Sequence, residues 1–140
     1  MVGILLVTHN GLGDSLLDCV RHVLRTLPSH LRSLSVYEDD DPAQKEAEGQ
    51  ALIAELDTGD GVLLLTDMFG ATPSNIARRL CQSEHVKGVA GVNLPMLLRI
   101  SCCCDKPLAE MAQRALEGGR ECIVFMDSEG HHAATKCLDH

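Results

Sequence analysis

The chain has 140 residues, 45% of them hydrophobic, which is enough to bury the core of one globular domain. Twelve basic against 20 acidic residues give a formal net charge of −8, the wrong sign for a protein that reads the nucleic-acid backbone. Aromatic residues make up only 2% of the chain, which argues against stacking platforms for single-stranded nucleic acid. An acidic surface instead suits basic protein partners.

The apolar runs and the cysteines indicate the compartment. No run approaches the roughly 18 apolar residues of a membrane span, and the N-terminus lacks the basic start of a signal peptide. We therefore expect a cytoplasmic chain without an integral membrane segment. The seven cysteines, among them the run Cys102–Cys104, form no C-x-x-C pair, so the usual zinc and thioredoxin spacings are absent. The favoured interpretation is small buried hydrophobes that are kept reduced.

Strands and helices are expected to alternate along the chain. Continuous apolar runs are typical of strands buried on both faces of a parallel sheet, and apolar residues at helical spacing separate these runs. The expected strands cover residues 2–8, 34–37, 61–66, 86–92 and 121–126, and the expected helices cover about 14–27, 42–58, 73–81, 94–98 and 107–117.

Helix-end signals support these boundaries. Asp41 is expected to cap the helix that begins at Pro42, and Thr72 to cap the helix that begins at Pro73, because proline is favoured at the first helical position. The pair Gly118–Gly119 is expected to close the last helix.

This alternation predicts a doubly wound α/β domain with right-handed crossovers. For a short chain that begins strand-helix-strand-helix-strand, a common strand order is 2-1-3-4. Residues 1–127 are expected to form the domain and residues 128–140 a polar C-terminal tail.

The first and third strands end in His9 and Asp67. In the order 2-1-3-4 these strands are neighbours, and the strand order reverses between them, which is where sites form in open α/β sheets. A carboxylate beside a histidine accepts one ring N–H, sets the tautomer and leaves the other nitrogen free. A neutral, oriented imidazole is a nucleophile or a base, so His9 and Asp67 are candidate catalytic residues.

The helix that begins at Thr72-Pro73 is expected to direct N–H groups and its positive dipole end toward the same space. Such a place suits a phosphoryl group, and Thr72 is placed to hydrogen-bond that group or the ring. Because Gly11 and Gly13 have no side chains, they would let the backbone of this loop approach a bound group closely. Together these features favour a histidine that is itself phosphorylated, at a site that needs neither a metal nor a cofactor.

Structural interpretations of the same residues stay open. A histidine at a strand end is more often structural than catalytic, and Asp67 could be an ordinary turn cap. The turn Gly11-Leu12-Gly13 lacks the third glycine or alanine of a dinucleotide fingerprint. The pair His131–His132 in the tail invites a metal interpretation, although adjacent histidines usually point apart and tails are commonly mobile.

Three segments carry a resemblance to a known family. They are Ile-Leu-Leu-Val-Thr-His-Asn-Gly, Leu-Leu-Thr-Asp-Met-Phe-Gly-Ala-Thr-Pro-Ser-Asn and Gly-Val-Asn-Leu-Pro-Met-Leu. In order and spacing the chain resembles the enzyme IIA component of the mannose family of the phosphoenolpyruvate:sugar phosphotransferase system (PTS). The resemblance covers residues 2 to about 126.

The resemblance implies that His9 accepts a phosphoryl group from the carrier HPr and passes it to a IIB protein. It also implies that Asp67 orients the histidine and that Thr72 lies beside it. Family members are dimers in which an antiparallel last strand can be exchanged between subunits, here residues 121–126. The chain departs from the family pattern at Ala71, where a second glycine is usual.

The acceptor and the purpose of phosphorylation remain open. A regulatory binding module whose phosphorylation state controls a partner, without sugar transport, is one alternative. A phosphoryl donor component for dihydroxyacetone kinase is another, because a related architecture serves there. A metal-dependent hydrolase that uses His9, Asp67 and the tail histidines is a third, weaker hypothesis.

Overall fold

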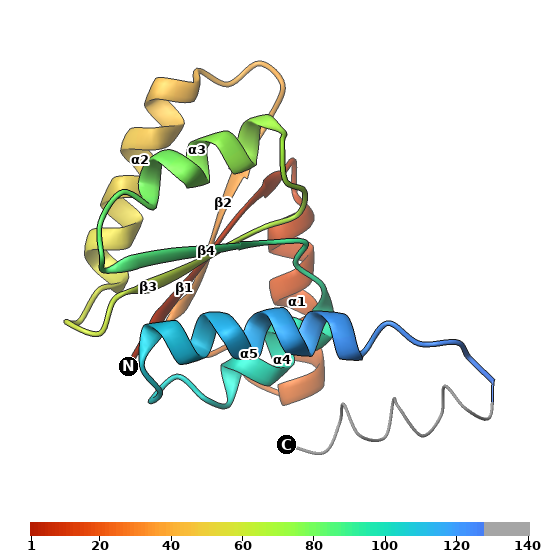
Figure 1. The fold of residues 1–140 in the computed structure, drawn as a ribbon. Helices are drawn as coiled ribbons and strands as arrows, with labels where there is room; N and C mark the ends of the chain where they lie inside the picture. The colour runs from red at the N-terminus through yellow and green to blue at the C-terminus, as the bar shows by residue number, and fades with distance from the viewer. Residues whose placement is uncertain (128–140) are drawn as a thin grey trace.

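In the computed structural model, which describes residues 1–127, four parallel strands form a sheet in the order β2-β1-β3-β4 (Figure 1). The predicted α/β fold and strand order are therefore confirmed. The strands are β1 (Gly3–His9), β2 (Leu31–Val36), β3 (Val62–Thr66) and β4 (Val86–Ala90).

Helices cover both faces of this sheet. Helices α1, α4 and α5 pack on one face, and α2 and α3 pack on the other (Figure 1). The helices are α1 (Leu12–Leu24), α2 (Pro42–Leu56), α3 (Thr72–Leu80), α4 (Leu94–Ser101) and α5 (Leu108–Glu121). Within residues 1–127, every helix falls short of the length and apolar character that a membrane crossing needs.

The central strand β1 supplies side chains to both cores. Ile4 and Leu6 belong to the cluster under α1, α4 and α5, whereas Leu5 and Val7 belong to the cluster under α2 and α3. Each of these four side chains is fully buried. Alternation along a strand produces this division, and it explains why the first run reads as continuously apolar rather than alternating.

Strand β4 differs from the core strand expected over residues 86–92. It is shorter, and only Val86 is buried, while Lys87, Gly88 and Ala90 are exposed. The reason is its position, because β4 pairs with β3 alone and forms an edge of the sheet.

Two helix ends also differ from expectation. Ala71 rather than Thr72 is the N-cap of α3, so Thr72 is the first residue of the helix. Helix α5 continues through Gly118–Gly119 instead of ending there. A Cβ at Gly119 would lie 2.9 Å from Met96 Cε, so this glycine lets α5 approach α4 closely rather than stopping the helix. Asp41, in contrast, caps α2 as predicted, accepting the N–H of Ala43 at 3.1 Å.

The strand predicted over residues 121–126 is wrong for the single chain. Helix α5 includes Glu121, and residues 122–127, the last that the structure describes, form no strand. Ile123 and Phe125 are 76% and 84% exposed. A strand needs a neighbouring strand to pair with, and after α5 the chain runs away from the sheet (Figure 1). Its exchange between subunits stays a prediction.

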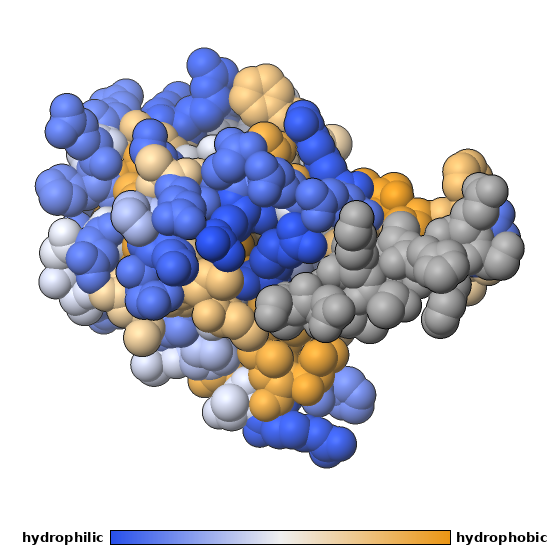
Figure 2. Space-filling model, turned by 60° about the horizontal axis from the view of Figure 1, so that its bottom comes forward, coloured by the Kyte–Doolittle hydropathy of each residue, from blue (hydrophilic) through white to orange (hydrophobic). Residues whose placement is uncertain are grey.

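On the face shown in Figure 2, hydrophobic side chains gather toward the lower part of the view. The residues from 128 onward, with the predicted polar tail and the pair His131–His132, lie outside the described residues.

The cysteines depart in part from the expectation of buried, reduced thiols. Cys104 is buried and Cys81 and Cys103 are half-buried, but Cys19 and Cys102 are exposed. A further cysteine, at position 122, is disulfide-bonded.

Candidate functional site

His9 and Asp67 meet at the carboxyl edge of the sheet. The register between β1 and β3 pairs Val7 with Thr66, which places the two strand ends side by side. His9 Nδ1 lies 2.8 Å from Asp67 Oδ2, and the same oxygen accepts the backbone N–H of His9 at 3.2 Å. An ionised carboxylate only accepts hydrogen bonds, so Nδ1 carries the proton and Nε2 keeps its lone pair.

The two side chains differ in exposure. The His9 ring is 42% exposed, whereas the Asp67 carboxylate is 13% exposed. The ring is thus open to a second molecule, while the carboxylate is largely shielded from solvent. Water therefore screens the attraction between the carboxylate and the ring only weakly. Asp67 Oδ1 is buried and, among residues 1–127, has no hydrogen-bond partner.

The turn after His9 is fixed by contacts with strands β1 and β2. The buried hydroxyl of Thr8 accepts the N–H of Gly13 at 2.8 Å, and a Cβ at Gly13 would clash with Ser33 Oγ. Gly13 therefore lets the start of α1 approach β1 and β2 closely. Gly11 faces open space, with Tyr37 Oη as the nearest atom at 4.0 Å from a Cβ built there. Gly13 is thus needed for packing, whereas Gly11 borders open space beside His9.

His9 and Thr72 line one cleft of about 620 Å³ at this edge. The segment after β2 also lines this cleft, with Tyr37, Glu38 and Asp40. Sequence reasoning did not assign these three residues to the site, although an acidic stretch directly after a buried strand was a usable signal. No hydrogen bond joins Thr72 to His9 within the described part of the chain.

Ser74 was also missed, and it organises the loop between β3 and α3. Its hydroxyl accepts the N–H groups of Gly70 at 2.8 Å and Ala71 at 3.1 Å, and it donates to the Ala71 carbonyl at 2.9 Å. Ser74 is 2% exposed. It occupies the third helical position, from which a side chain reaches back to the N-cap, as in a capping box.

This arrangement modifies the predicted anion pocket. The N–H groups of Gly70 and Ala71 bind Ser74, and Pro73 has no N–H. The positive end of the α3 dipole still faces the cleft through Thr72 and Pro73. The N–H groups of Gly70 and Ala71 are therefore not available to an anion, and the positive end of the helix dipole is what this loop leaves for it.

Residues 1–127 contain no group of three or more histidine, cysteine or acidic side chains that could hold a metal ion. The tail histidines of the hydrolase hypothesis lie outside the described residues.

The fold, together with His9 and Asp67 at the ends of β1 and β3, defines a class of protein. Its members are small doubly wound domains that present one histidine where the strand order reverses. The family model described as "PTS system fructose IIA component" matches residues 3–117. The chain belongs to this family of PTS IIA components.

Among curated relatives, the mannose-specific EIIAB component of Escherichia coli K12 is 42% identical over 82 residues, which is 56% of this chain. The match spans 25% of the length of that relative. Its name joins a IIA and a IIB component.

Solved structures show the same fold. The mannose/sorbose-specific IIA subunit from Enterococcus faecalis has a TM-score of 0.80 at 21% identity, covering 90% of this chain and 95% of that one. The EIIA component from Streptococcus agalactiae has a TM-score of 0.78 at 20% identity, covering 89% and 97%.

Proposed function

We propose that this protein is a phosphocarrier of the PTS. His9 accepts a phosphoryl group from HPr and passes it to a IIB protein. The observation that carries this proposal is the 2.8 Å contact between His9 Nδ1 and Asp67 Oδ2 at an accessible strand end. Membership in the PTS IIA family supports the same chemistry.

The geometry indicates which nitrogen reacts. With Nδ1–H bound to Asp67, the Nε2 lone pair is the nucleophile. It forms the new P–N bond while the bond from phosphorus to the HPr histidine breaks, and the ring then carries positive charge. The Asp67 carboxylate stabilises that charge and keeps the tautomer. Transfer to IIB runs the same steps with the nitrogen as leaving group.

The rest of the cleft has supporting roles in this proposal. Thr72 offers a hydroxyl to the phosphoryl oxygens, and the start of α3 adds its positive dipole. The chain has a net charge of −8, and Glu38 and Asp40 line the cleft. This charge suits a partner with a basic face that docks over His9. We also propose a cytoplasmic location and a homodimer, as the family resemblance implies.

The experiment is a reconstituted phosphorylation with phosphoenolpyruvate, enzyme I and HPr. We expect one acid-labile, base-stable phosphate per chain, located on His9 by peptide mapping. His9→Ala should not be labelled, whereas His22→Ala, which alters an exposed histidine on α1, should be labelled like the wild type. Labelling of His9→Ala at the wild-type rate would overturn the proposal.

Onward transfer needs a second step. Labelled protein is separated from HPr and mixed with a matched IIB protein. Loss of the label from His9 and its appearance on IIB is the expected result. Retention of the label with every IIB protein of the host would contradict the carrier role and favour a regulatory one.

A further inference from the structure

Asn10, the residue after His9, has an unusual backbone conformation. Its φ is 49°, and among residues 1–127 the other non-glycine residue with a positive φ is Arg25, at 66°. The backbone N–H of Asn10 donates to the Val36 carbonyl at 2.9 Å, so β2 holds the residue in place. A side chain in this left-handed region costs free energy relative to glycine, and such residues concentrate at functional sites.

The side chain of Asn10 is available to a ligand. Asn10 is exposed, and it lines the cleft of about 620 Å³ together with His9 and Thr72. An asparagine amide has two N–H donors, and among residues 1–127 no hydrogen bond engages them. A free hydrogen-bond donor therefore belongs to the same cleft as the nucleophilic Nε2 of His9.

A phosphoryl group on His9 would meet little positive charge in this cleft. The group carries about two negative charges at neutral pH. The described residues that line the cleft include Glu38 and Asp40 but neither lysine nor arginine. Lys45, on the first turn of α2, pairs with Asp40 at 3.6 Å and with Glu48 at 3.1 Å. The oxygens of the group therefore depend on neutral donors.

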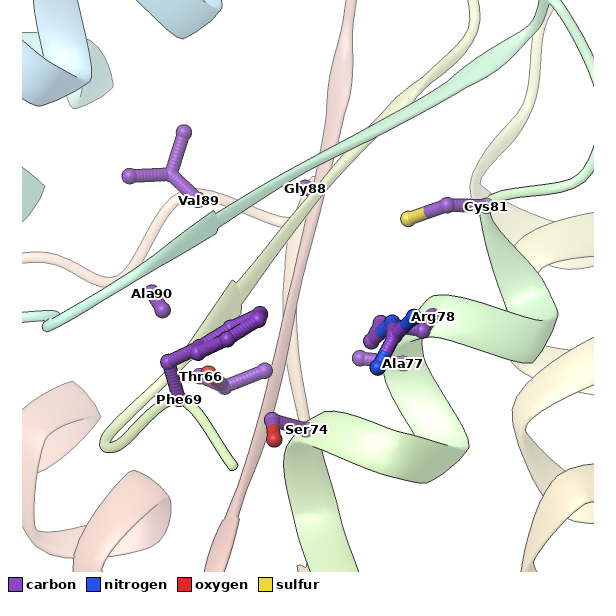
Figure 3. Close-up of a pocket in the computed structure, with 9 residues that line it drawn as sticks. All are labelled: Thr66, Phe69, Ser74, Ala77, Arg78, Cys81, Gly88, Val89 and Ala90. Atoms are coloured by element: carbon purple, nitrogen blue, oxygen red, sulfur yellow. The ribbon is translucent and has the colours of Figure 1, made fainter. Parts of the chain in front are cut away.

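The two arginines of α3 do not supply the missing charge. Arg78 lines a separate cavity between α3, β4 and the loop after β3, and its guanidinium carbon lies 5.9 Å from the centre of the Phe69 ring (Figure 3). Arg79 pairs with Glu46 at 3.6 Å. Neither arginine lines the cleft that contains His9.

We propose that Asn10 binds the phosphoryl group, its carboxamide N–H donating to an oxygen of that group during transfer to and from His9. This inference rests on the proposed carrier function. Asn10 acts from the end of β1 and Thr72 from the start of α3. Asn10 forms no covalent bond, so the bonds made and broken are those of the carrier mechanism. A neutral amide binds the oxygens less tightly than a cation, which suits a group that must leave again.

A purely local role for Asn10 is the competing explanation. Asparagine tolerates the left-handed region better than most non-glycine residues, so the turn alone would account for its presence. Glycine separates the two roles, because it adopts the same φ without a side chain. Arg25→Gly is the matched control, since it makes the same exchange at the residue that caps the end of α1.

The first test measures transfer from phosphorylated HPr to His9 by rapid quench. Loss of one donor to a developing charge costs about 10²–10³-fold in a closed site, so at this exposed one we expect Asn10→Gly to slow transfer by at least about tenfold. Asn10→Asp should be slower still, because its carboxylate repels the phosphoryl group. Arg25→Gly should transfer at the wild-type rate. Urea unfolding should show that all three variants are folded.

The second test does not depend on rates. A pH titration of the phosphorylated protein, followed by phosphorus NMR, gives the pKa of the phosphoryl group. Hydrogen-bond donors stabilise its more highly charged form and lower this pKa. The pKa should therefore rise in Asn10→Gly and rise further in Asn10→Asp, whereas a residue with only a backbone role would leave it unchanged in Asn10→Gly.

Two results would overturn the proposal. One is a wild-type transfer rate with an unchanged phosphoryl pKa in Asn10→Gly. The other is equal slowing in Asn10→Gly and Arg25→Gly, which would indicate a backbone effect alone. In both cases the wild-type protein is still phosphorylated on His9, so the carrier function stands. Wild-type protein that is not labelled on His9 would instead overturn both proposals.

Discussion

His9 Nδ1 lies 2.8 Å from Asp67 Oδ2, although 58 positions separate the two residues in the chain. The contact exists because β1 and β3 are parallel neighbours in register, so that both strands end at the same edge. The carboxylate also accepts the backbone N–H of His9 at 3.2 Å, which ties the loop after β3 to the end of β1. Orientation of the ring is thus a product of sheet register rather than of local sequence.

We predict that Asp67→Asn slows phosphorylation of His9 by HPr by roughly 10²–10⁴-fold, the range of a positioned acid–base group. The amide carbonyl still accepts Nδ1–H, but it no longer provides the negative charge that stabilises the phosphorylated ring. Rapid-quench kinetics measure the effect, and Asp18→Asn on the exposed face of α1 is the control. An unchanged rate in Asp67→Asn would remove Asp67 from the mechanism.

Ser74→Ala is predicted to affect both stability and transfer. It removes the acceptor of the Gly70 and Ala71 N–H groups, so the free energy of unfolding should fall by about 1–3 kcal/mol. Because the freed loop leads directly into Thr72 at the start of α3, we expect kcat for transfer to fall more than the affinity for HPr. Urea titration and transfer kinetics give the two quantities, with Asn75→Ala, at an exposed neighbour, as control. Destabilisation without any kinetic change would show that Ser74 is structural only.

Thiol reactivity should differ along the cysteine run. Burial, with smaller effects of neighbouring charges, raises the pKa of Cys104 to about 12, and its Sγ lies 2.7 Å from His30 Nε2. Only the thiolate reacts, so Cys104 should resist iodoacetamide, whereas exposed Cys19 and Cys102 should be alkylated first. Peptide mass spectrometry after timed quenching gives the order. Early alkylation of Cys104 in folded protein would contradict this environment.

The burial of His30 also predicts a pH dependence of stability. Burial, followed by the nearby N-terminal ammonium, lowers the pKa of His30 below its ordinary value of about 6.5. The unfolded chain therefore binds the proton more readily, so stability is complete above that value and declines as the pH falls through it toward the folded pKa. His30→Gln should lose this part of the decline, measured as urea-unfolding free energies between about pH 7.5 and 5.5. His22→Gln, at an exposed position, should keep it.

Local patterns predicted much of this molecule. Continuous apolar runs indicated that β1 and β3 are buried on both faces, and Asp41-Pro42 marked the start of α2, because these signals act within a few residues. The strand order followed from the alternation of elements, which leaves few compact topologies for a short chain. From that order, the sequence also brought His9 and Asp67 to one edge of the sheet.

Tertiary structure decided what local patterns could not. Gly118 and Gly119 resembled a helix stop, but α5 continues through them because their missing side chains make room for α4. Residues 121–126 have the composition of a strand but lack a neighbour in the single chain, and composition does not supply one. The roles of Ser74 and Asn10 depend on which loop and strand lie against them. Hydrogen-bond partners and cavities arise from contacts between distant segments, so they emerge only when the chain is folded.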